Sequence, residues 1–522
     1  MPHKDNAFAP YFQCRIAYFG GFCRLPDTSY PFFFLFICFI TSLSAQQQML
    51  TPELLWKTGR VALECASQDG RYVVYAVQRY SVQDNKGTRV LYLAEGATGA
   101  ARALSNPEKS SSNAIFTPDG RRIGFLQDDQ LWEIPVEGSD AVATRISTET
   151  MSGFKYAPDG RHLLFTRAVA HDTTVSTLYP DLPGTSGRLY DGLFYRHWKS
   201  WNNGQYSNIF LADYADGQVQ GTPVNIQNEP FDSPVAPFGG MEQITWSPDS
   251  RFIVYTSRKL SGTAAAQSTN SDLYIYELKS GKTLNLTEDL PGYDQDPVFS
   301  PDGRHLTWTS MQRAGYEADR TRLMLLDLNT QQRRDLTADW TFEANHPQWA
   351  ADSKSLYFLS AENFTYQLYN IRVQDAKISR LTEGQHDYSG LIVPPKRSET
   401  VYALRTTMTQ PPEVYAIETR NGIARPLSSV TADPWNGIAK ATVERHTVRT
   451  GDGKDLNVWM VLPPDFNPSK KYPALLYCQG GPQSALSQGF SFRWNFQLMA
   501  SQGYVVIAPC RRGMPGAGQA WC

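Results

Sequence analysis

The side chains best suited to binding a ligand gather in one short segment, Tyr190–Trp201, which reads YDGLFYRHWKSW. Aromatic and basic groups at this density are typical of a loop that contacts a ligand or a second domain. A long loop that packs only on its own surroundings fits the segment equally well. The candidate ligand-binding residues are Asp191, Tyr195, Arg196, His197, Trp198 and Trp201.

Three other motifs resemble binding sites but lack a required part. Gly513–Gly518 follows an apolar strand as a nucleotide loop would, but its glycines do not follow the order G-x-G-x-x-G. Asp294–Asp296 and Asp213–Gly217 resemble calcium loops, yet neither has the terminal glutamate at the required offset. The seven cysteines include no CxxC pair. The sequence therefore predicts no metal site and no cofactor.

The composition narrows the classes of partner. Lys and Arg number 49 against 51 Asp and Glu, and no basic stripe that could neutralise phosphates stands out, so nucleic acid is not expected. A length of 522 residues predicts at least two domains. Aromatic residues make up 12% of the chain, which favours β structure.

A repeated sequence pattern predicts the architecture that positions these residues. A turn of the type Pro-Asp-Gly, followed by an alternating apolar strand, recurs at steps of about 40 to 53 residues, with one step of about 90. Proline presets φ, aspartate bonds its own backbone and glycine closes the turn. Four strands in each such period predict a β-propeller blade. The central aspartates are Asp69, Asp119, Asp159, Asp249, Asp302 and Asp352.

Six copies of the pattern are visible, and 391–427 fits a degenerate seventh blade. The long step could hide an eighth blade, but the hairpin at Asn208–Ile226 already completes the third. We therefore expect His171–Gln205 to be an insertion and predict a seven-bladed propeller over residues 46–434.

The N-terminal 45 residues are predicted to be an export signal. Pro31–Ile40 is an apolar run, and mostly small residues ending at Ala45 follow it, as in a signal peptide. The run is too short to cross a bilayer comfortably as a helix, and a buried hydrophobic strand is the alternative. About thirty residues precede it, so Met1 need not be the true start. An exported protein, periplasmic or secreted and without a stable membrane span, is expected.

The pattern changes after Pro434. A hairpin around Gly451–Gly453, an apolar strand ending at Cys478, a glycine loop, a helix through Phe496 and a second apolar strand, Gly503–Ala508, follow in order. Strand, glycine loop, helix and strand are the opening of a doubly wound α/β sheet.

Three distinctive sequence blocks allow this segment to be compared with a known family. They are YPALLYCQGGP from Tyr472, GYVVIAP from Gly503 and RRGMPGAG from Arg511. Together with the preceding propeller, they resemble the prolyl oligopeptidase family of serine peptidases, closest to its bacterial dipeptidyl-peptidase V and acylaminoacyl-peptidase-like members. The resemblance implies a mainly β fold: a seven-bladed β-propeller followed by the first part of an α/β-hydrolase domain, 435–522. It also implies short peptides as substrates.

By this resemblance, Gln479, Gly480 and Gly481 form the loop that helps stabilise the oxyanion, although the glycines could simply make a tight turn. In the family, a serine on a G-x-S-x-G elbow is the nucleophile, with a histidine and an aspartate. No G-x-S-x-G occurs in the 522 residues, and the last histidine is His446 in the connecting hairpin. We therefore assign no catalytic residue and expect a C-terminally truncated, inactive chain.

Two expectations follow for the strand Gly503–Ala508. Without the rest of the sheet it should present unpaired backbone groups and bare Val505, Val506 and Ile507. Proteolysis should then trim the chain to near Thr431–Ala441 and leave the propeller.

The function expected is that of a dipeptidyl or acylaminoacyl exopeptidase. Dipeptidyl members hold the substrate's ammonium with an acidic group; some relatives use a Glu-Glu pair, which is absent here, so Asp181 and Asp191 are the candidates. An exported TolB-like propeller that binds proteins is the alternative, since folds do not fix function. A separate downstream chain that supplies the rest of the hydrolase is a third possibility.

Overall fold

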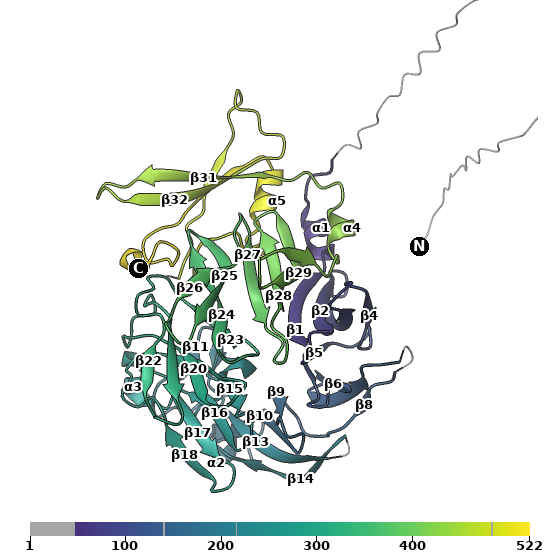
Figure 1. Cartoon of the computed structure of the whole chain (residues 1–522), viewed down its shortest axis with the longest axis vertical. Helices are drawn as coiled ribbons and strands as arrows, with labels where there is room; N and C mark the ends of the chain where they lie inside the picture. Colours follow the sequence, from purple (N-terminus) through teal and green to yellow (C-terminus); the bar gives the residue numbers. More distant parts are fainter. Residues whose placement is uncertain (1–46, 139–140, 216, 482–483) are drawn as a thin grey trace, which may run out of the picture. The chain divides into compact units, whose positions relative to one another are not determined.

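The computed structural model describes residues 47–138, 141–215, 217–481 and 484–522. The expected signal segment lies outside these residues. Within them, seven four-stranded antiparallel sheets follow one another along the chain (Figure 1). The first three contain β1 (Arg60–Ala66), β2 (Tyr72–Ser81), β3 (Lys86–Glu95) and β4 (Ala101–Ala103); β5 (Ser111–Phe116), β6 (Arg122–Gln127), β7 (Gln130–Pro135) and β8 (Thr144–Arg145); and β9 (Gly153–Tyr156), β10 (His162–Ala170), β13 (Gln205–Ala215) and β14 (Gln218–Asn225).

The other four blades use consecutive strands throughout. They contain β15 (Ile244–Trp246), β16 (Phe252–Ser257), β17 (Asp272–Glu277) and β18 (Lys282–Asn285); β19 (Asp294–Phe299), β20 (His305–Ser310), β21 (Arg322–Asp327) and β22 (Arg333–Asp335); β23 (Asn345–Trp349), β24 (Ser355–Glu362), β25 (Thr365–Arg372) and β26 (Ile378–Arg380); and β27 (Asp387–Ile392), β28 (Thr400–Thr407), β29 (Gln410–Glu418) and β30 (Ala424–Pro426).

The sheets close into a ring by side-chain packing. Each blade shares a buried apolar cluster with the next, and blade seven shares one with blade one. In that last cluster, Val414 of β29 packs with Val61 and Val73 of blade one. Tyr402 also donates a hydrogen bond to the carbonyl of Gly70, at 2.6 Å. The seven-bladed propeller predicted from the repeat is confirmed.

The repeated turn works as its chemistry predicts. In four turns a hydroxyl two residues earlier donates to the aspartate at 2.6–2.7 Å, as Thr117 does to Asp119. Two copies have serine where the others have glycine, Ser250 and Ser353, each at a φ of 59°. Each of these hydroxyls accepts a hydrogen bond from the turn of the preceding blade; Ser250 accepts from the Asp159 N–H at 2.9 Å. These contacts join neighbouring blades where a glycine could not.

The long step in the repeat is an insertion in blade three, as expected. Strand β10 pairs directly with β13 across it, so the blade is complete without the inserted residues. The insertion contains the short helix α2 (Val175–Leu178) and the two-stranded hairpin of β11 (Arg196–His197) and β12 (Ser200–Trp201).

The segment after the propeller forms its own sheet. Its order is β31 (Thr442–Arg449), β32 (Asp455–Leu462), β34 (Val505–Pro509) and β33 (Ala474–Leu476). Strand β34 pairs antiparallel with β32 and parallel with β33, and helix α5 (Phe496–Ser501) connects β33 to β34. The remaining helices are α1 (Pro52–Lys57), α3 (Gly262–Gln267), α4 (Ala432–Trp435), η1 (Met241–Gln243) and η2 (Gln519–Trp521).

This order corrects the expectation for the strand Gly503–Ala508. Because β34 lies between two partners, its backbone is paired on both sides, and Val506 is buried. The strands at the two edges of this sheet are β31 and β33, and Leu475 and Leu476 of β33 are exposed. The reason for expecting proteolysis to begin at β34 is therefore wrong.

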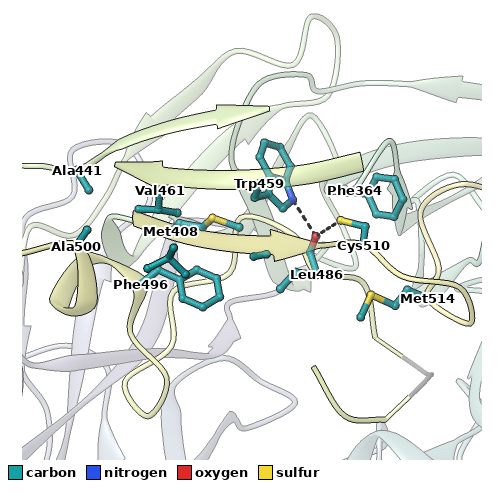
Figure 2. Close-up of a cluster of buried hydrophobic side chains, with 12 residues drawn as sticks. Phe364, Met408, Ala441, Trp459, Val461, Leu486, Phe496, Ala500, Cys510 and Met514 are labelled. Atoms are coloured by element: carbon teal, nitrogen blue, oxygen red, sulfur yellow. Dashed lines mark hydrogen bonds between the residues drawn. The ribbon is translucent and has the colours of Figure 1, made fainter. Parts of the chain in front are cut away.

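The core of this sheet includes side chains from the propeller (Figure 2). Phe364, at the turn between β24 and β25, and Met408, at the turn between β28 and β29, pack with Trp459, Val461 and Val506. Residues 47–522 accordingly form one compact unit. No helix in the described part of the chain is long and apolar enough to cross a bilayer.

Candidate functional site

A cavity of about 1450 Å³ lies beside the insertion of blade three. Its walls come from four places: the hairpin β11–β12, the segment before β15, the loops of blades four and five, and the chain after β34. The first two walls supply the apolar side chains Leu193, Phe194, Trp201 and Phe238. A cavity of this size, lined by both apolar and polar groups, can accommodate a small organic ligand or a short peptide.

The structure brings only some of the predicted ligand-binding residues to this cavity. Arg196, His197 and Trp201 line it. Asp191, Tyr195 and Trp198 are not among the described residues of its lining. Trp198 is 72% exposed at the tip of the hairpin, where its ring packs against that of Phe238, with centroids 5.5 Å apart.

Both interpretations of the insertion therefore have support from its contacts. Tyr190, Tyr195 and Trp201 form a cluster of rings with centroids 6.0–6.2 Å apart, so part of the loop packs on itself. The guanidinium groups of Arg188 and Arg196 lie 5.7 and 5.5 Å from the centre of the Trp201 ring. This packing fixes Trp201, which also forms part of the cavity wall.

Acidic groups line the cavity from the propeller. Glu242 precedes β15, and its carboxylate accepts a hydrogen bond from the Gly240 N–H at 2.7 Å. Asp296 lies at a bulge of β19, with a φ of 54°. Burial raises the pKa of Asp296 to about 7; the charge of Glu242 adds to this effect, and Lys155 opposes it. The two carboxyl groups thus interact in the same part of the cavity.

A buried lysine accompanies the two acids. The Lys155 ammonium donates to the carbonyl of Ile244 at 2.5 Å, and burial lowers its pKa to about 8 although Glu242 and Asp296 favour its charged form. His346, on β23, also interacts with Glu242, and burial lowers its pKa. Glu242 is thus the group common to these interactions, and its side chain is exposed to the cavity.

The two aspartates proposed as acidic anchors do not reach this place. Asp181 and Asp191 are exposed, and neither is among the described lining residues. Sequence reasoning missed Glu242, which belongs to no motif. Asp296 had a signal, the Asp294–Asp296 run that resembles a calcium loop. In the described residues no three His, Cys, Asp or Glu side chains come together as a metal site would require.

The loop Gln479–Gly481 follows β33 and is held by an arginine. Arg511 donates from Nε to the Gln479 carbonyl and from Nη2 to the Gly481 carbonyl, both at 3.0 Å. These two bonds occupy the carbonyl groups of Gln479 and Gly481. The Gln479 amide donates to the Ser484 hydroxyl at 2.9 Å. The loop is not among the described residues lining the cavity, whereas Gly513 and Cys522 are.

Comparisons with known proteins cover nearly the whole chain. The TolB beta propeller domain family matches residues 243–435. Dipeptidyl-peptidase 5 of Porphyromonas gingivalis is 38% identical over 90% of this chain and 69% of its own length. Dipeptidyl-peptidase 5 of Porphyromonas endodontalis is 36% identical over 92% and 70%. These relatives match more of the chain than the propeller occupies.

Solved structures agree on the fold. The acylaminoacyl peptidase of Pyrococcus horikoshii superposes with a TM-score of 0.71 at 16% identity and covers 91% of this chain and 69% of its own. A structure from a study of two prolyl endopeptidases superposes with a TM-score of 0.60 at 15% identity, over 91% and 65%. At this identity they show the shared fold alone: a propeller followed by a hydrolase sheet.

Proposed function

The chain belongs to the prolyl oligopeptidase family of serine peptidases, and we propose that it serves the release of dipeptides from short peptides with a free amino end. The observation that carries this proposal is the pair of acidic groups, Glu242 and Asp296, at one cavity. A dipeptidyl substrate presents an ammonium group there, whereas an acylated amino end presents a neutral amide. The names of the relatives favour the same class.

The electrostatics of the cavity support an ammonium site. Glu242 is held by the Gly240 N–H and keeps a second oxygen for a ligand. Hydrogen bonds between charged groups are stronger than those between neutral ones. Lys155 donates to a backbone carbonyl and, with a pKa of about 8, is mainly charged at neutral pH, so it offsets one of the two acidic groups. A ligand ammonium would offset the negative charge that remains on the two acidic groups.

The first test compares a dipeptide with its N-acetyl derivative. We expect the 522-residue chain to bind alanyl-phenylalanine more tightly than acetyl-alanyl-phenylalanine in isothermal titration calorimetry. Glu242→Gln should reduce this preference by about 10-fold, because it removes a hydrogen bond to a charged group. Asp191→Asn is the matched control, since Asp191 is exposed and lies away from the cavity lining.

Three results would count against the proposal. A preference unchanged in Glu242→Gln would show that this carboxylate does not hold the ammonium. Loss of the preference in Asp191→Asn would show that Asp191, in the insertion, binds the ammonium. Equal binding of the two ligands by the unaltered chain would favour the acylaminoacyl class instead.

We also propose that the 522-residue polypeptide does not itself hydrolyse peptides. The motif G-x-S-x-G is absent from these residues, and no histidine follows His446. The oxyanion loop alone has no reaction to assist without a nucleophile and a base. The alternative of a TolB-like protein-binding module has less support, because the peptidase relatives match 90% of the chain, beyond the propeller.

Export is proposed from the segment Pro31–Ala45. We expect N-terminal sequencing of the protein from the cell envelope or the medium to begin near Gln46, because signal peptides are removed after small residues. A mature protein that begins at Met1 would contradict cleavage.

A further inference from the structure

The candidate oxyanion loop runs into a segment that touches the propeller. Residues 484–489 follow the loop, and the Ser487 hydroxyl donates to Oδ2 of Asp387 at 2.5 Å. Asp387 begins β27 in blade seven and is 4% exposed. Its Oδ1 accepts a second hydrogen bond from the Tyr366 N–H at 3.0 Å, and the Gln488 N–H is a third donor to this carboxylate. One propeller carboxylate therefore binds two residues of this segment.

The other side of the same segment is held by the hydrolase sheet. The Leu486 carbonyl accepts from Trp459 Nε1 at 2.9 Å and from the Cys510 thiol at 3.3 Å, as Figure 2 shows. The Gln488 side chain accepts from the Met408 N–H at 3.5 Å. The segment is therefore held between β32, Cys510 directly after β34, and blade seven of the propeller.

We propose that Asp387 is a positioning residue through which the propeller fixes the segment 484–489, to which the candidate oxyanion loop Gln479–Gly481 is joined by the hydrogen bond from the Gln479 amide to the Ser484 hydroxyl. The role of the loop in catalysis rests on the proposed function, but the positioning itself does not. Burial raises the pKa of Asp387 to about 6, opposed by the donors around it, so at neutral pH the group is mainly a carboxylate. A carboxylate can only accept, which matches the three donors that surround it.

Hydrogen exchange of backbone amides in the 522-residue chain, followed by mass spectrometry, tests this proposal without any catalytic assay. Asp387→Ala should lower the protection of the amides of 485–489 by about 10- to 100-fold, because the buried carboxylate that accepts from the Ser487 hydroxyl and the Gln488 N–H is lost. Asp387→Asn keeps an acceptor oxygen and should restore part of the protection. A residue that only supports the overall fold would not show this local loss and rescue.

The Ser487→Ala variant removes the donor of the same hydrogen bond. It should lower protection in the same peptides, and the double variant with Asp387→Ala should add less than the two single changes together. Asp302→Ala is the matched control, because Asp302 also accepts from a serine, Ser300, at 2.6 Å, but in a turn of blade five.

Unchanged exchange of 485–489 in Asp387→Ala would overturn the proposal. So would a loss of protection of equal size in all blades, or an equal effect of Asp302→Ala on 485–489. These outcomes do not depend on whether Glu242 binds an ammonium, so failure of the ligand proposal and failure of the positioning proposal remain separate results.

Discussion

Replacing Phe364 with alanine is expected to lower the free energy of unfolding of the segment after the propeller by about 3–5 kcal/mol, the range for removing a buried phenylalanine. The ring is 4% exposed and lies in a core whose other members come mainly from β32, β34 and α5. The turn that presents it is fixed: Asn363 and Phe364 have φ values of 55° and 60°, and the Asn363 N–H donates to the Gly516 carbonyl at 2.8 Å. The cavity left by the ring therefore cannot close easily.

Urea unfolding followed by tryptophan fluorescence measures this loss, because Trp459 and Trp521 lie in the segment. Phe238→Ala is the matched control: its ring is 77% exposed, so its removal should change stability by less than about 0.5 kcal/mol. A loss below about 1 kcal/mol in Phe364→Ala would show that the sheet does not depend on the propeller for its core.

The purified 522-residue chain is expected to show no measurable turnover of dipeptidyl or acyl-aminoacyl substrates. Loss of the nucleophile or its base in a serine peptidase costs about 10⁶ in kcat. An oxyanion loop and a binding cavity leave only a small fraction of that rate. Fluorogenic dipeptidyl and acyl-aminoacyl amides, incubated with the chain at pH 7 to 8, measure this directly.

A serine-directed phosphonate provides the control for contaminating enzymes. Any trace activity should be abolished by the reagent without its mass appearing on the 522-residue chain. Turnover together with a labelled serine within these residues would contradict the prediction and would reveal a nucleophile that the G-x-S-x-G motif does not describe.

The blades and their order could be predicted from the sequence because their signals are local. A turn of the type at Asp119 is built from the side chains and φ values of four neighbouring residues, and the strand after it alternates with a period of two. The same logic correctly placed the insertion 171–205, since the hairpin after it supplied the missing strands of blade three. Turn chemistry does not depend on distant parts of the chain.

The candidate site was predictable only in part. Aromatic and basic density found Arg196, His197 and Trp201, which line the cavity, but it could not separate them from Trp198, which is exposed and is not among the lining residues. Glu242 carries no local signal, because one glutamate before a strand is ordinary in sequence. Its place beside Asp296 depends on the closure of the ring, which brings residues of different blades to one cavity.

The tertiary structure also determined the strand order and the core of the last sheet. From the sequence, Gly503–Ala508 was a central strand without neighbours, because strand order is not written in an apolar run. In the fold, β34 crosses between β32 and β33, and Phe364 and Met408 complete its core from the propeller. Local chemistry therefore determined the turns, strands and blade count of this protein. Contacts between residues far apart in the chain, which stabilise only once the backbone has brought them together, determined its cavity, its sheet order and the joint between its two parts.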